Sequence, residues 1–340
     1  MVNGIKKGKS KNRVGLDIGN HSIKIVELSG VPEKGAVACF GLKKIMGSSQ
    51  DAVVTSIKSL AEELRISAKD VNISVSGPSL IVRLISMPKM SDAELAGAVR
   101  FETEKFIPFD INDCILDFQI LNREVKDKNN IDILLAAAKK EYVWQRIKTV
   151  EEAGFVVKTV DVDIFAIMNS FLKNSPSLDQ SKTLALLNIG ASSTDLSILR
   201  GSLPVFVREI AMGSNEFSAV IAKKTGLTQD QSEELKLAPK EKLAEVMSCT
   251  KPVITNLLDE VRLSFGYHEN QSGRGVDEIC ISGGGAGMAG LEEAFQEAFG
   301  SKPRYWDPFQ SLDKSSPAID AAALDKVKHS FCVAVGLALR

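Results

Sequence analysis

Two segments of the chain, about half its length apart, repeat one pattern of hydrophobic and polar positions. Residues 14–28 form two apolar limbs around a polar turn at 19–22, and residues 184–199 repeat this pattern around a polar turn at 190–193. Apolar residues that alternate with others beside a short turn are typical of a β-hairpin. The sequence therefore predicts two hairpins of similar design.

The repeat continues beyond the hairpins. Each half adds a third strand, an amphipathic helix and a strand that ends in a glycine-containing turn, at 37–45, 49–64 and 72–76 in the first half and at 203–210, 214–224 and 277–282 in the second. Self-similarity on this scale indicates architecture. We expect an α/β fold of two lobes, each a β-β-β-α-β unit, facing each other across a cleft.

Segments without a counterpart in the other half predict insertions. Helices at 91–105 and 141–153 and the strands beside them indicate an α+β insert in the first lobe, with a capping box formed by Ser91 and Glu94. The predicted organisation is a flexible basic tail (1–13), the first part of lobe one (14–88), the insert (89–162), a bridging helix and linker (163–182), lobe two (183–320) with a helical insert at about 222–252, and a closing helix (321–340) that packs back on lobe one.

Composition narrows the class of protein. The chain has 340 residues and a net charge of -1, which gives no electrostatic case for nucleic acid. Five scattered cysteines without a C-x-x-C pair fit reduced thiols rather than a disulfide framework or a zinc site. No apolar run approaches the roughly 20 residues of a membrane span. The lysines of the tail allow at most a weak peripheral contact with anionic lipid, and a solvated tail is the simpler interpretation.

Glycine turns are the candidate chemical features. Gly19 lets the first turn approach a ligand closely, Asp17 ends the strand before it, and Lys24 lies near enough to help hold a phosphate. A late run, 283–288, follows a buried strand and precedes a helix, where the backbone favours an anion. Its spacing is neither that of a dinucleotide-binding fingerprint nor that of a Walker A loop.

Charged residues in other segments leave alternatives open. Glu233 and Lys236 lie one helical turn apart, either as a surface ion pair or beside a nucleotide's sugar and base. Asp163 is expected to cap the bridging helix, with water orientation near a phosphate as the alternative, and Asp161 flanks the same entry. The three histidines lack metal-ligand spacing, and no Ser/His/Asp grouping points to a nucleophilic hydrolase.

With its three glycine turns in this order, the chain resembles the actin-like ATPase superfamily. Within that superfamily it is similar to the PilM family of type IV pilus assembly proteins and more distantly to FtsA. The similarity includes the Phe106-Ile107-Pro108-Phe109 segment, the stretch from Gly226 through Lys236, and the final residues 334–340. It implies a duplicated, RNase H-like two-lobed fold that binds ATP or ADP with Mg²⁺.

The resemblance carries specific roles to positions in this chain. The first phosphate turn takes Asp17, Gly19, Asn20, His21, Ser22 and Lys24, and the second takes Asn188, Gly190, Ala191, Ser192, Ser193 and Thr194. Glu233 and Lys236 match the ribose side, and Gly283, Gly284, Gly285 and Met288 match the adenosine loop. Asp17 and Asp163 are the candidate catalytic carboxylates.

Asn188 departs from the superfamily pattern, which usually has an aspartate there. The change removes a negative charge from the expected Mg²⁺ shell and leaves Asp17 as the principal carboxylate at the metal. We therefore expect ATP binding with weak or absent hydrolysis, because phosphoryl transfer depends on the placement of metal and water.

The resemblance also implies a partner. It predicts a cytoplasmic assembly protein, peripheral at the inner face of the inner membrane, that docks the N-terminal cytoplasmic peptide of PilN. Other pilus ATPases or platform proteins and a homo-oligomer are further candidates. Phe101, Phe106, Ile107 and Phe109 are the candidate groove residues, or else they form the core of the insert. The alternative functions are a small-molecule kinase on the same fold and an FtsA-like membrane-tethered filament protein.

Overall fold

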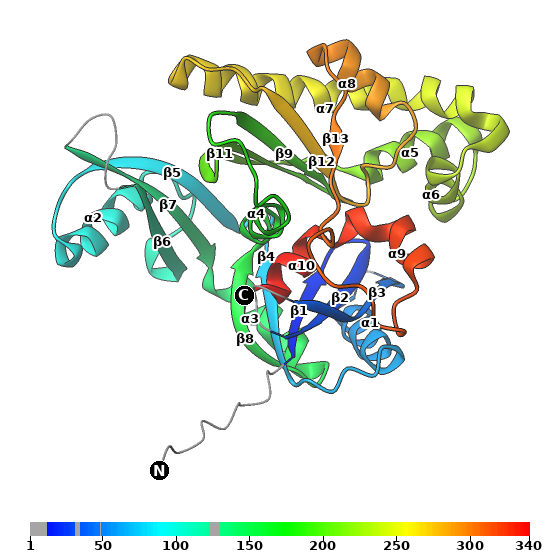
Figure 1. Ribbon diagram of the computed structural model, residues 1–340, viewed down its shortest axis with the longest axis horizontal. Helices are drawn as coiled ribbons and strands as arrows, with labels where there is room; N and C mark the ends of the chain where they lie inside the picture. The colour runs from blue at the N-terminus through cyan, green and yellow to red at the C-terminus, as the bar shows by residue number, and fades with distance from the viewer. Residues whose placement is uncertain (1–11, 31–34, 48, 123–128) are drawn as a thin grey trace.

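The computed structural model describes residues 12–30, 35–47, 49–122 and 129–340 and contains two five-stranded sheets with the same strand order. In lobe one the order is β3-β2-β1-β4-β8, and in lobe two it is β11-β10-β9-β12-β13. Each begins with three antiparallel strands and continues with parallel ones. This duplicated arrangement confirms the predicted two-lobed fold (Figure 1).

Lobe one consists of its sheet and the helices that cover it. Its elements are β1 (Arg13–Ile18), β2 (Ser22–Ser29), β3 (Ala36–Lys44), α1 (Gln50–Glu63), β4 (Asp70–Val75), α3 (Lys140–Glu152) and β8 (Val156–Val162). α1 begins at Ser49, whose side chain accepts a hydrogen bond from the backbone of Ala52.

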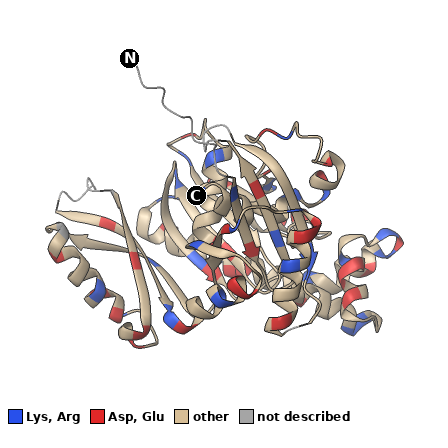
Figure 2. Cartoon of the chain, turned by 90° about the horizontal axis from the view of Figure 1, so that it is seen from below, with Lys and Arg blue, Asp and Glu red and all other residues tan. Residues whose placement is uncertain are grey.

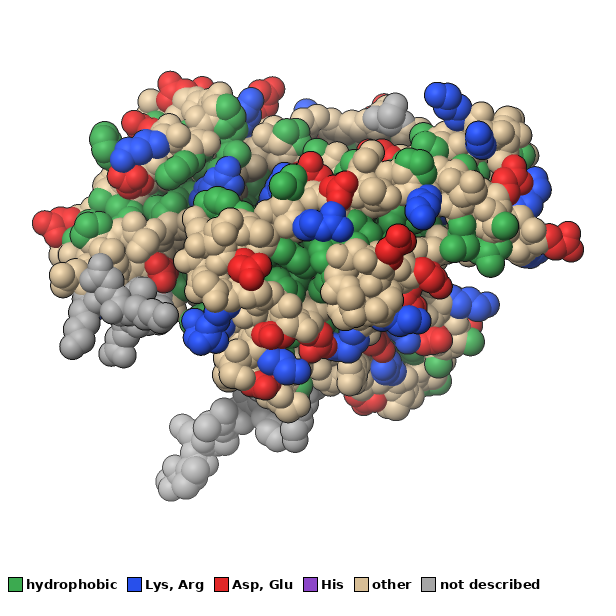
Figure 3. Space-filling model, turned by 90° about the horizontal axis from the view of Figure 1, so that it is seen from above, with side chains coloured by type: hydrophobic (Ala, Val, Ile, Leu, Met, Phe, Trp, Pro, Cys, Tyr) green, Lys and Arg blue, Asp and Glu red, His purple; other side chains and the backbone are tan. Residues whose placement is uncertain are grey.

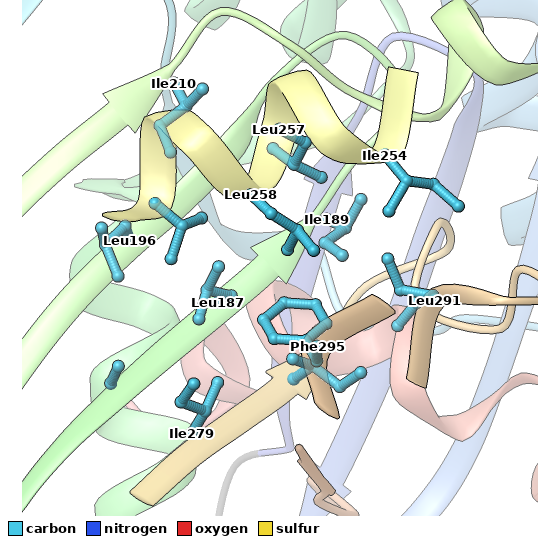
Figure 4. Close-up of a cluster of buried hydrophobic side chains, with 14 of the residues drawn as sticks. Leu187, Ile189, Leu196, Ile210, Ile254, Leu257, Leu258, Ile279, Leu291 and Phe295 are labelled. Carbon is cyan, nitrogen blue, oxygen red and sulfur yellow. The ribbon is translucent and has the colours of Figure 1, made fainter. Parts of the chain in front are cut away.

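Lobe two repeats the plan and adds helices. Its elements are β9 (Thr183–Ile189), β10 (Thr194–Arg200), β11 (Leu203–Ile210), α5 (Ser214–Thr225), α6 (Gln229–Leu237), α7 (Leu243–Ser272), β12 (Glu278–Ser282), α8 (Leu291–Phe299) and β13 (Arg304–Tyr305). Figure 4 shows its core, where Leu187 and Ile189 of β9 meet Leu257 of α7 and Phe295 of α8. All four side chains are fully buried, so α7 and α8 are fixed to the sheet by hydrophobic contact.

The insert differs from its predicted bounds of 89–162. Its sheet has the order β5-β7-β6, made of β5 (Leu80–Pro88), β7 (Asn130–Lys139) and β6 (Cys114–Asn122), with α2 (Asp92–Glu104) on one face. β5, placed in lobe one by the prediction, pairs along its whole length with β7. β8, placed in the insert, pairs in parallel with β4, and its Val157 and Val160 pack, partly buried, against the core of lobe one. Viewed from below, the insert projects to one side of the two lobes (Figure 2).

Two predicted helix boundaries are wrong. The sequence predicts separate helices at 241–249 and 252–267, whereas α7 runs unbroken through Pro252. Val246 before the proline and Ile254 after it are both buried on one face of this continuous helix. The predicted closing helix is divided into α9 (Ala321–Val327), a 3-10 turn and α10 (Cys332–Ala338). Residues 1–11 of the predicted basic tail lie outside the described residues, and Arg13 already belongs to β1.

The lobes meet at a layer of small residues. α10 packs between β1 and α4 (Asp163–Asn174), the bridging helix. A Cβ atom on Gly15 of β1 would lie 2.0 Å from the carbonyl oxygen of Ala334, and one on Gly336 would lie 1.9 Å from the carbonyl oxygen of Ala166. Three backbones are therefore in direct contact here, and only glycine fits at either position.

Candidate functional site

The two predicted hairpin turns share one geometry. The backbone N–H of Gly19 donates to the carbonyl of Ser22 at 3.2 Å, and the N–H of Gly190 donates to the carbonyl of Ser193 at 2.8 Å. A Cβ atom at Gly19 or Gly190 would lie 3.1 or 2.9 Å from those same carbonyl oxygens. A side chain at either position would therefore crowd that carbonyl oxygen, more closely at Gly190 than at Gly19.

The structure brings the two turns together. The Asn20 side-chain amide donates to the hydroxyl of Ser192 at 2.9 Å, across a separation of 172 residues. Two further contacts join the lobes: an ion pair between Lys44 and Asp230, and a hydrogen bond from the backbone N–H of Gly77 to Glu209 at 2.8 Å. A ligand held by one turn would therefore also meet the other.

The start of α5 lies against the second turn. Backbone N–H groups of Ser214 and Asn215 donate to the carbonyls of Gly190 and Ala191, both at 2.8 Å. Thr194 is buried and donates its hydroxyl to the carbonyl of Met212 at 2.8 Å. These N–H groups of α5 already have acceptors within the protein, so it is the dipole of the helix, positive at its N-terminal end, that favours negative charge beside the second turn.

The third glycine turn, predicted at 283–288, lies beside the second. The N–H of Gly285 donates to the carbonyl of Ile189 at 2.9 Å, and a Cβ atom on Gly283, whose φ is +95°, would lie 2.3 Å from that oxygen. Gly284 has space around it, with the Ser330 hydroxyl 3.6 Å from a Cβ placed there. Met288 is buried in the core of lobe two and supports the turn from within.

Lobe one contributes a buried ion pair. Asp17 is 6% exposed, and its carboxylate lies 3.1 Å from the ammonium of Lys24. Burial raises the pKa of Asp17, although Lys24 opposes the shift. Asp163, whose charge also raises this pKa, is the first residue of α4; the helix is capped by Val162 without a side-chain hydrogen bond, so the predicted capping role of Asp163 is wrong. As a residue inside the first turn of α4, Asp163 instead faces the other carboxylates.

Lobe two contributes a carboxylate that the sequence interpretation missed. Asp195 pairs across the β9–β10 ladder with Asn188, whose amide donates to it at 3.4 Å, and it is 7% exposed. Burial, with Asp163 and Glu209 nearby, raises the pKa of Asp195 well above its usual value. The Asn188 carbonyl accepts from the hydroxyl of Ser282 at 3.3 Å, which fixes the amide. The register of the hairpin was the signal that could have found Asp195.

Glu233 and Lys236 form a buried pair rather than a surface one. The Lys236 side chain is fully buried, and its ammonium lies 2.6 Å from Glu233 and 3.2 Å from the carbonyl of Ser214. Burial lowers the pKa of Lys236, whereas hydrogen bonds from Lys236 and Ser218 outweigh burial and lower the pKa of Glu233. Burial also lowers the pKa of His21, and Glu233 opposes this shift, which places the first turn beside α6.

The described residues contain no cluster of three or more His, Cys, Asp or Glu side chains arranged to hold a metal ion. Asp17, Asp163 and Asp195 contribute negative charge at one place without forming a closed set of ligands. Mg²⁺ usually keeps several waters and takes the rest of its shell from one or two carboxylates and a phosphate. The residues present therefore fit a magnesium ion that enters together with a nucleotide.

The four predicted groove residues do not line one cavity. Phe101 is 64% exposed on α2, with the ammonium of Lys105 over its ring. Phe106 lines a cavity of 1170 Å³ between the insert and lobe two, which we call the interlobe slot. Ile107 and Phe109 are half-buried and line neither this slot nor the second cavity described below.

A second cavity of 590 Å³, which we call the insert groove, lies between the insert sheet and lobe one. Its lining is mainly apolar and includes Ile115 and Leu134 of the insert, Val143 of α3 and Phe165 of α4. Arg340 borders it and pairs with buried Asp161 at 2.6 Å.

Comparison with known proteins identifies the family. The model of the type IV pilus assembly protein PilM matches residues 15–340. The chain belongs to the PilM family. A solved PilM-PilN type IV pilus biogenesis complex is 28% identical, covers 97% of this chain and 98% of its own, and superposes with a TM-score of 0.87. The ethanolamine utilization protein EutJ from Carboxydothermus hydrogenoformans is 13% identical over 97% of this chain and 89% of its own, with a TM-score of 0.59, which shows a shared fold.

Membership of the PilM family makes the chain a type IV pilus assembly protein with the actin-like ATPase fold. Across the described residues, no helix has both the length and the apolar character needed to cross a membrane. Of the sequence-based expectations, the family, the fold and the assembly role are therefore confirmed.

Proposed function

We propose that this PilM-family chain binds ATP or ADP with Mg²⁺ between its two hairpin turns. The observation that carries the proposal is the hydrogen bond from Asn20 to Ser192, because it places two glycine turns of the same geometry in contact. The actin-like ATPase fold supports it.

The binding roles follow from the position of each group. Residues 19–22 and 190–194 would hold the phosphates, assisted by Lys24 and the start of α5. Gly283, Gly284 and Gly285 would hold the adenosine, with Glu233 and Lys236 at the ribose. Asp17 and Asp195 would accept hydrogen bonds from the waters of Mg²⁺. The bound metal would offset the charge that these buried carboxylates share with the phosphates.

Titration calorimetry with ATP, in Mg²⁺ and in EDTA, tests this proposal. We expect saturable binding that weakens when Mg²⁺ is removed. Ser192→Glu would place a carboxylate against the phosphates and weaken binding at least about tenfold, or about 1.4 kcal/mol. Ser202→Glu, on the turn after β10, is the control and should bind as the wild type does. Absence of saturable binding to folded wild-type protein would overturn the proposal.

We propose further that the insert groove docks the N-terminal segment of PilN, the protein named with PilM in the solved complex. α2 covers one face of the insert sheet, and the groove lies on the opposite face, which α4 covers only in part. Its apolar floor and the outer strand β6 suit an extended peptide, which gains main-chain hydrogen bonds from a strand edge and selectivity from pockets. Such docking would hold the chain at the inner face of the inner membrane.

A pair of exposed substitutions separates this groove from the surface of α2 around Phe101. Ile115 is 41% exposed at the groove and Phe101 is 64% exposed outside it, so glutamate at either position should leave the fold intact. We expect Ile115→Glu to weaken binding of a PilN N-terminal peptide at least about tenfold and Phe101→Glu to leave it unchanged. The reverse result would move the site to Phe101, and no binding to wild type would exclude this partner.

A further inference from the structure

The interlobe slot is bounded by the outer strands of two different sheets. β5 ends the insert sheet and β11 ends the sheet of lobe two, within the described part of the chain. Consecutive residues of both strands line the cavity, from Leu80 to Met87 and from Val205 to Glu209. The strands approach each other where Glu209 accepts the N–H of Gly77, just before β5 begins (Figure 1). The slot therefore has two strand edges as its walls.

Apolar side chains remain exposed on both sides of this slot. Phe106, at the end of α2, is 41% exposed, and Leu263 and Tyr267 of α7 are 64% and 55% exposed. Tyr267 lies against Phe206 of β11 with ring centroids 5.8 Å apart. On the face seen in Figure 3, hydrophobic side chains reach the surface among charged ones of both signs. Large apolar side chains gathered at one hollow indicate an interaction site.

The charged side chains along the slot differ from one end to the other. Asp163, Asp195 and Glu209 line it, and Glu209 marks the end where β5 begins through its contact with Gly77. Farther along, Arg208 pairs with Glu260 at 2.7 Å, and Glu102 pairs with Lys105 at 2.6 Å. Arg83, in the middle of β5, is exposed and has no ion-pair partner among the residues that the structure describes. An arginine in this position is suited to a carboxylate, which it can bind through two parallel hydrogen bonds.

We propose that the slot receives an extended segment of a partner protein that pairs with the free edge of β5. The segment has apolar residues at alternate positions, which contact Phe106 and the exposed side chains of α7, and a carboxylate that pairs with Arg83. Pro88 at the end of β5 is compatible with an outer strand and sets the limit of the pairing. Strand addition supplies main-chain hydrogen bonds that do not depend on sequence, so the carboxylate and the apolar contacts provide the specificity.

The walls of the slot move with different lobes, because β5 is carried by lobe one and β11 belongs to lobe two. A nucleotide that changes the angle between the lobes would change the width of the slot. This dependence rests on the proposed nucleotide function, whereas docking of the segment does not.

A random library of 12-residue peptides displayed on phage, selected on the full chain, supplies the probes. We expect enriched peptides with alternating apolar residues and one Asp or Glu. Their synthetic copies should bind Arg83→Glu at least about tenfold more weakly than wild type. Replacing the peptide's acid by Lys should recover part of the affinity for Arg83→Glu. Arg200→Glu, at an exposed arginine outside the slot, is the matched control.

Hydrogen exchange gives an independent readout, since a paired strand protects the outward amides of residues 80–87. Protection of these amides by an enriched peptide supports the proposal. The proposal is overturned if no enriched peptide binds Arg83→Glu more weakly than wild type, or if hydrogen exchange along β5 is unchanged by the peptides. If the PilN peptide itself loses binding in Arg83→Glu and protects β5, the slot proposal stands and the insert groove is the wrong site for PilN. If the selected peptides bind equally well with and without ATP, only the proposed dependence of the slot's width on nucleotide is contradicted.

Discussion

The two hairpins have nearly the same backbone and opposite arrangements of charge. In lobe one the cross-strand pair before the turn is Asp17 with Lys24, and in lobe two the equivalent pair is Asn188 with Asp195. Each pair has one carboxylate, carried by the first strand in lobe one and by the second strand in lobe two. The negative charge that Asn188 removes is therefore present one strand away, on Asp195.

This comparison teaches that equivalent residues of the two lobes are found by comparing cross-strand pairs, rather than single positions along the sequence. The two carboxylates also differ in what surrounds them. Asp17 has a lysine 3.1 Å away, whereas Asp195 has only an amide at 3.4 Å and other acids nearby. The charge of Asp17 in lobe one is thus offset by Lys24 without a ligand. The charge of Asp195 in lobe two would be offset by a metal ion or a proton.

The largest expected effect comes from removing the lysine of lobe one. Lys24→Met leaves the carboxylate of Asp17 buried and unpaired, so we expect the free energy of unfolding to fall by about 3 kcal/mol at neutral pH, measured by urea denaturation. The control is Lys43→Met, which breaks the exposed pair with Glu63 and should cost about 0.5 kcal/mol. Equal costs for the two variants would mean that Asp17 and Lys24 are not coupled in the folded protein.

The second effect is a pH dependence specific to lobe two. Because the pKa of Asp195 in the folded chain lies above the 3.8 of an exposed aspartate, its contribution to stability is complete below pH 3.8 and is lost as pH rises through the raised pKa. Between pH 3.8 and the raised pKa, the free energy of unfolding falls by about 1.4 kcal/mol per pH unit.

Asp195→Asn should flatten this slope and raise the unfolding free energy at neutral pH, in the absence of Mg²⁺ and nucleotide. The remaining slope should report Asp17 and Glu209, whose pKa values burial also raises. Thermal denaturation of the wild type and of Asp195→Asn across the pH range measures both slopes. A steeper slope in Asp195→Asn would contradict the assignment.

A smaller difference separates the two turn glycines. A methyl group at Gly190 would lie 2.9 Å from the Ser193 carbonyl oxygen, and one at Gly19 would lie 3.1 Å from that of Ser22. We expect Gly190→Ala to cost about 2 kcal/mol of unfolding free energy and Gly19→Ala about 1 kcal/mol. Urea denaturation of both variants tests the order, and a larger cost at Gly19 would show that the turns are less alike than their hydrogen bonds indicate.

The smallest effect concerns the contact between the turns. Asn20 and Ser192 form an exposed hydrogen bond, so a double-mutant cycle of Asn20→Ala and Ser192→Ala should give a coupling of about 0.5 kcal/mol. The cycle is measured on stability and again on ATP affinity. A coupling near zero in both would mean that the turns approach each other without an energetic link.

Much of the fold was readable because the determining patterns are local. Alternation around Gly19 and Gly190 specifies both hairpins, and a helix followed by a glycine-ended strand repeats in both halves. Asp195 could have been found by counting back from the turn, since Ile189 pairs with Thr194 and the next pair is Asn188 with Asp195.

Other features depend on pairing between distant segments. β5 joins the insert because it pairs with β7, some fifty residues later in the chain, and no pattern within residues 80–88 indicates that partner. β8 belongs to lobe one rather than to the insert for the same reason, because it pairs with β4. The proline in α7 is tolerated because burial on both sides of it favours one continuous helix, which local propensity alone does not predict.

The glycine layer between β1, α10 and α4 determines how the halves of the molecule can move. With backbones touching at Gly15 and Gly336, sliding would force main-chain atoms into overlap, so the remaining freedom is rotation about this line of contact. Under rotation, atoms shift in proportion to their distance from the axis. A tilt too small to disturb the packing of α10 would produce its largest displacement at the outer ends of the lobes, so a small movement at the two hairpin turns would be amplified at the periphery.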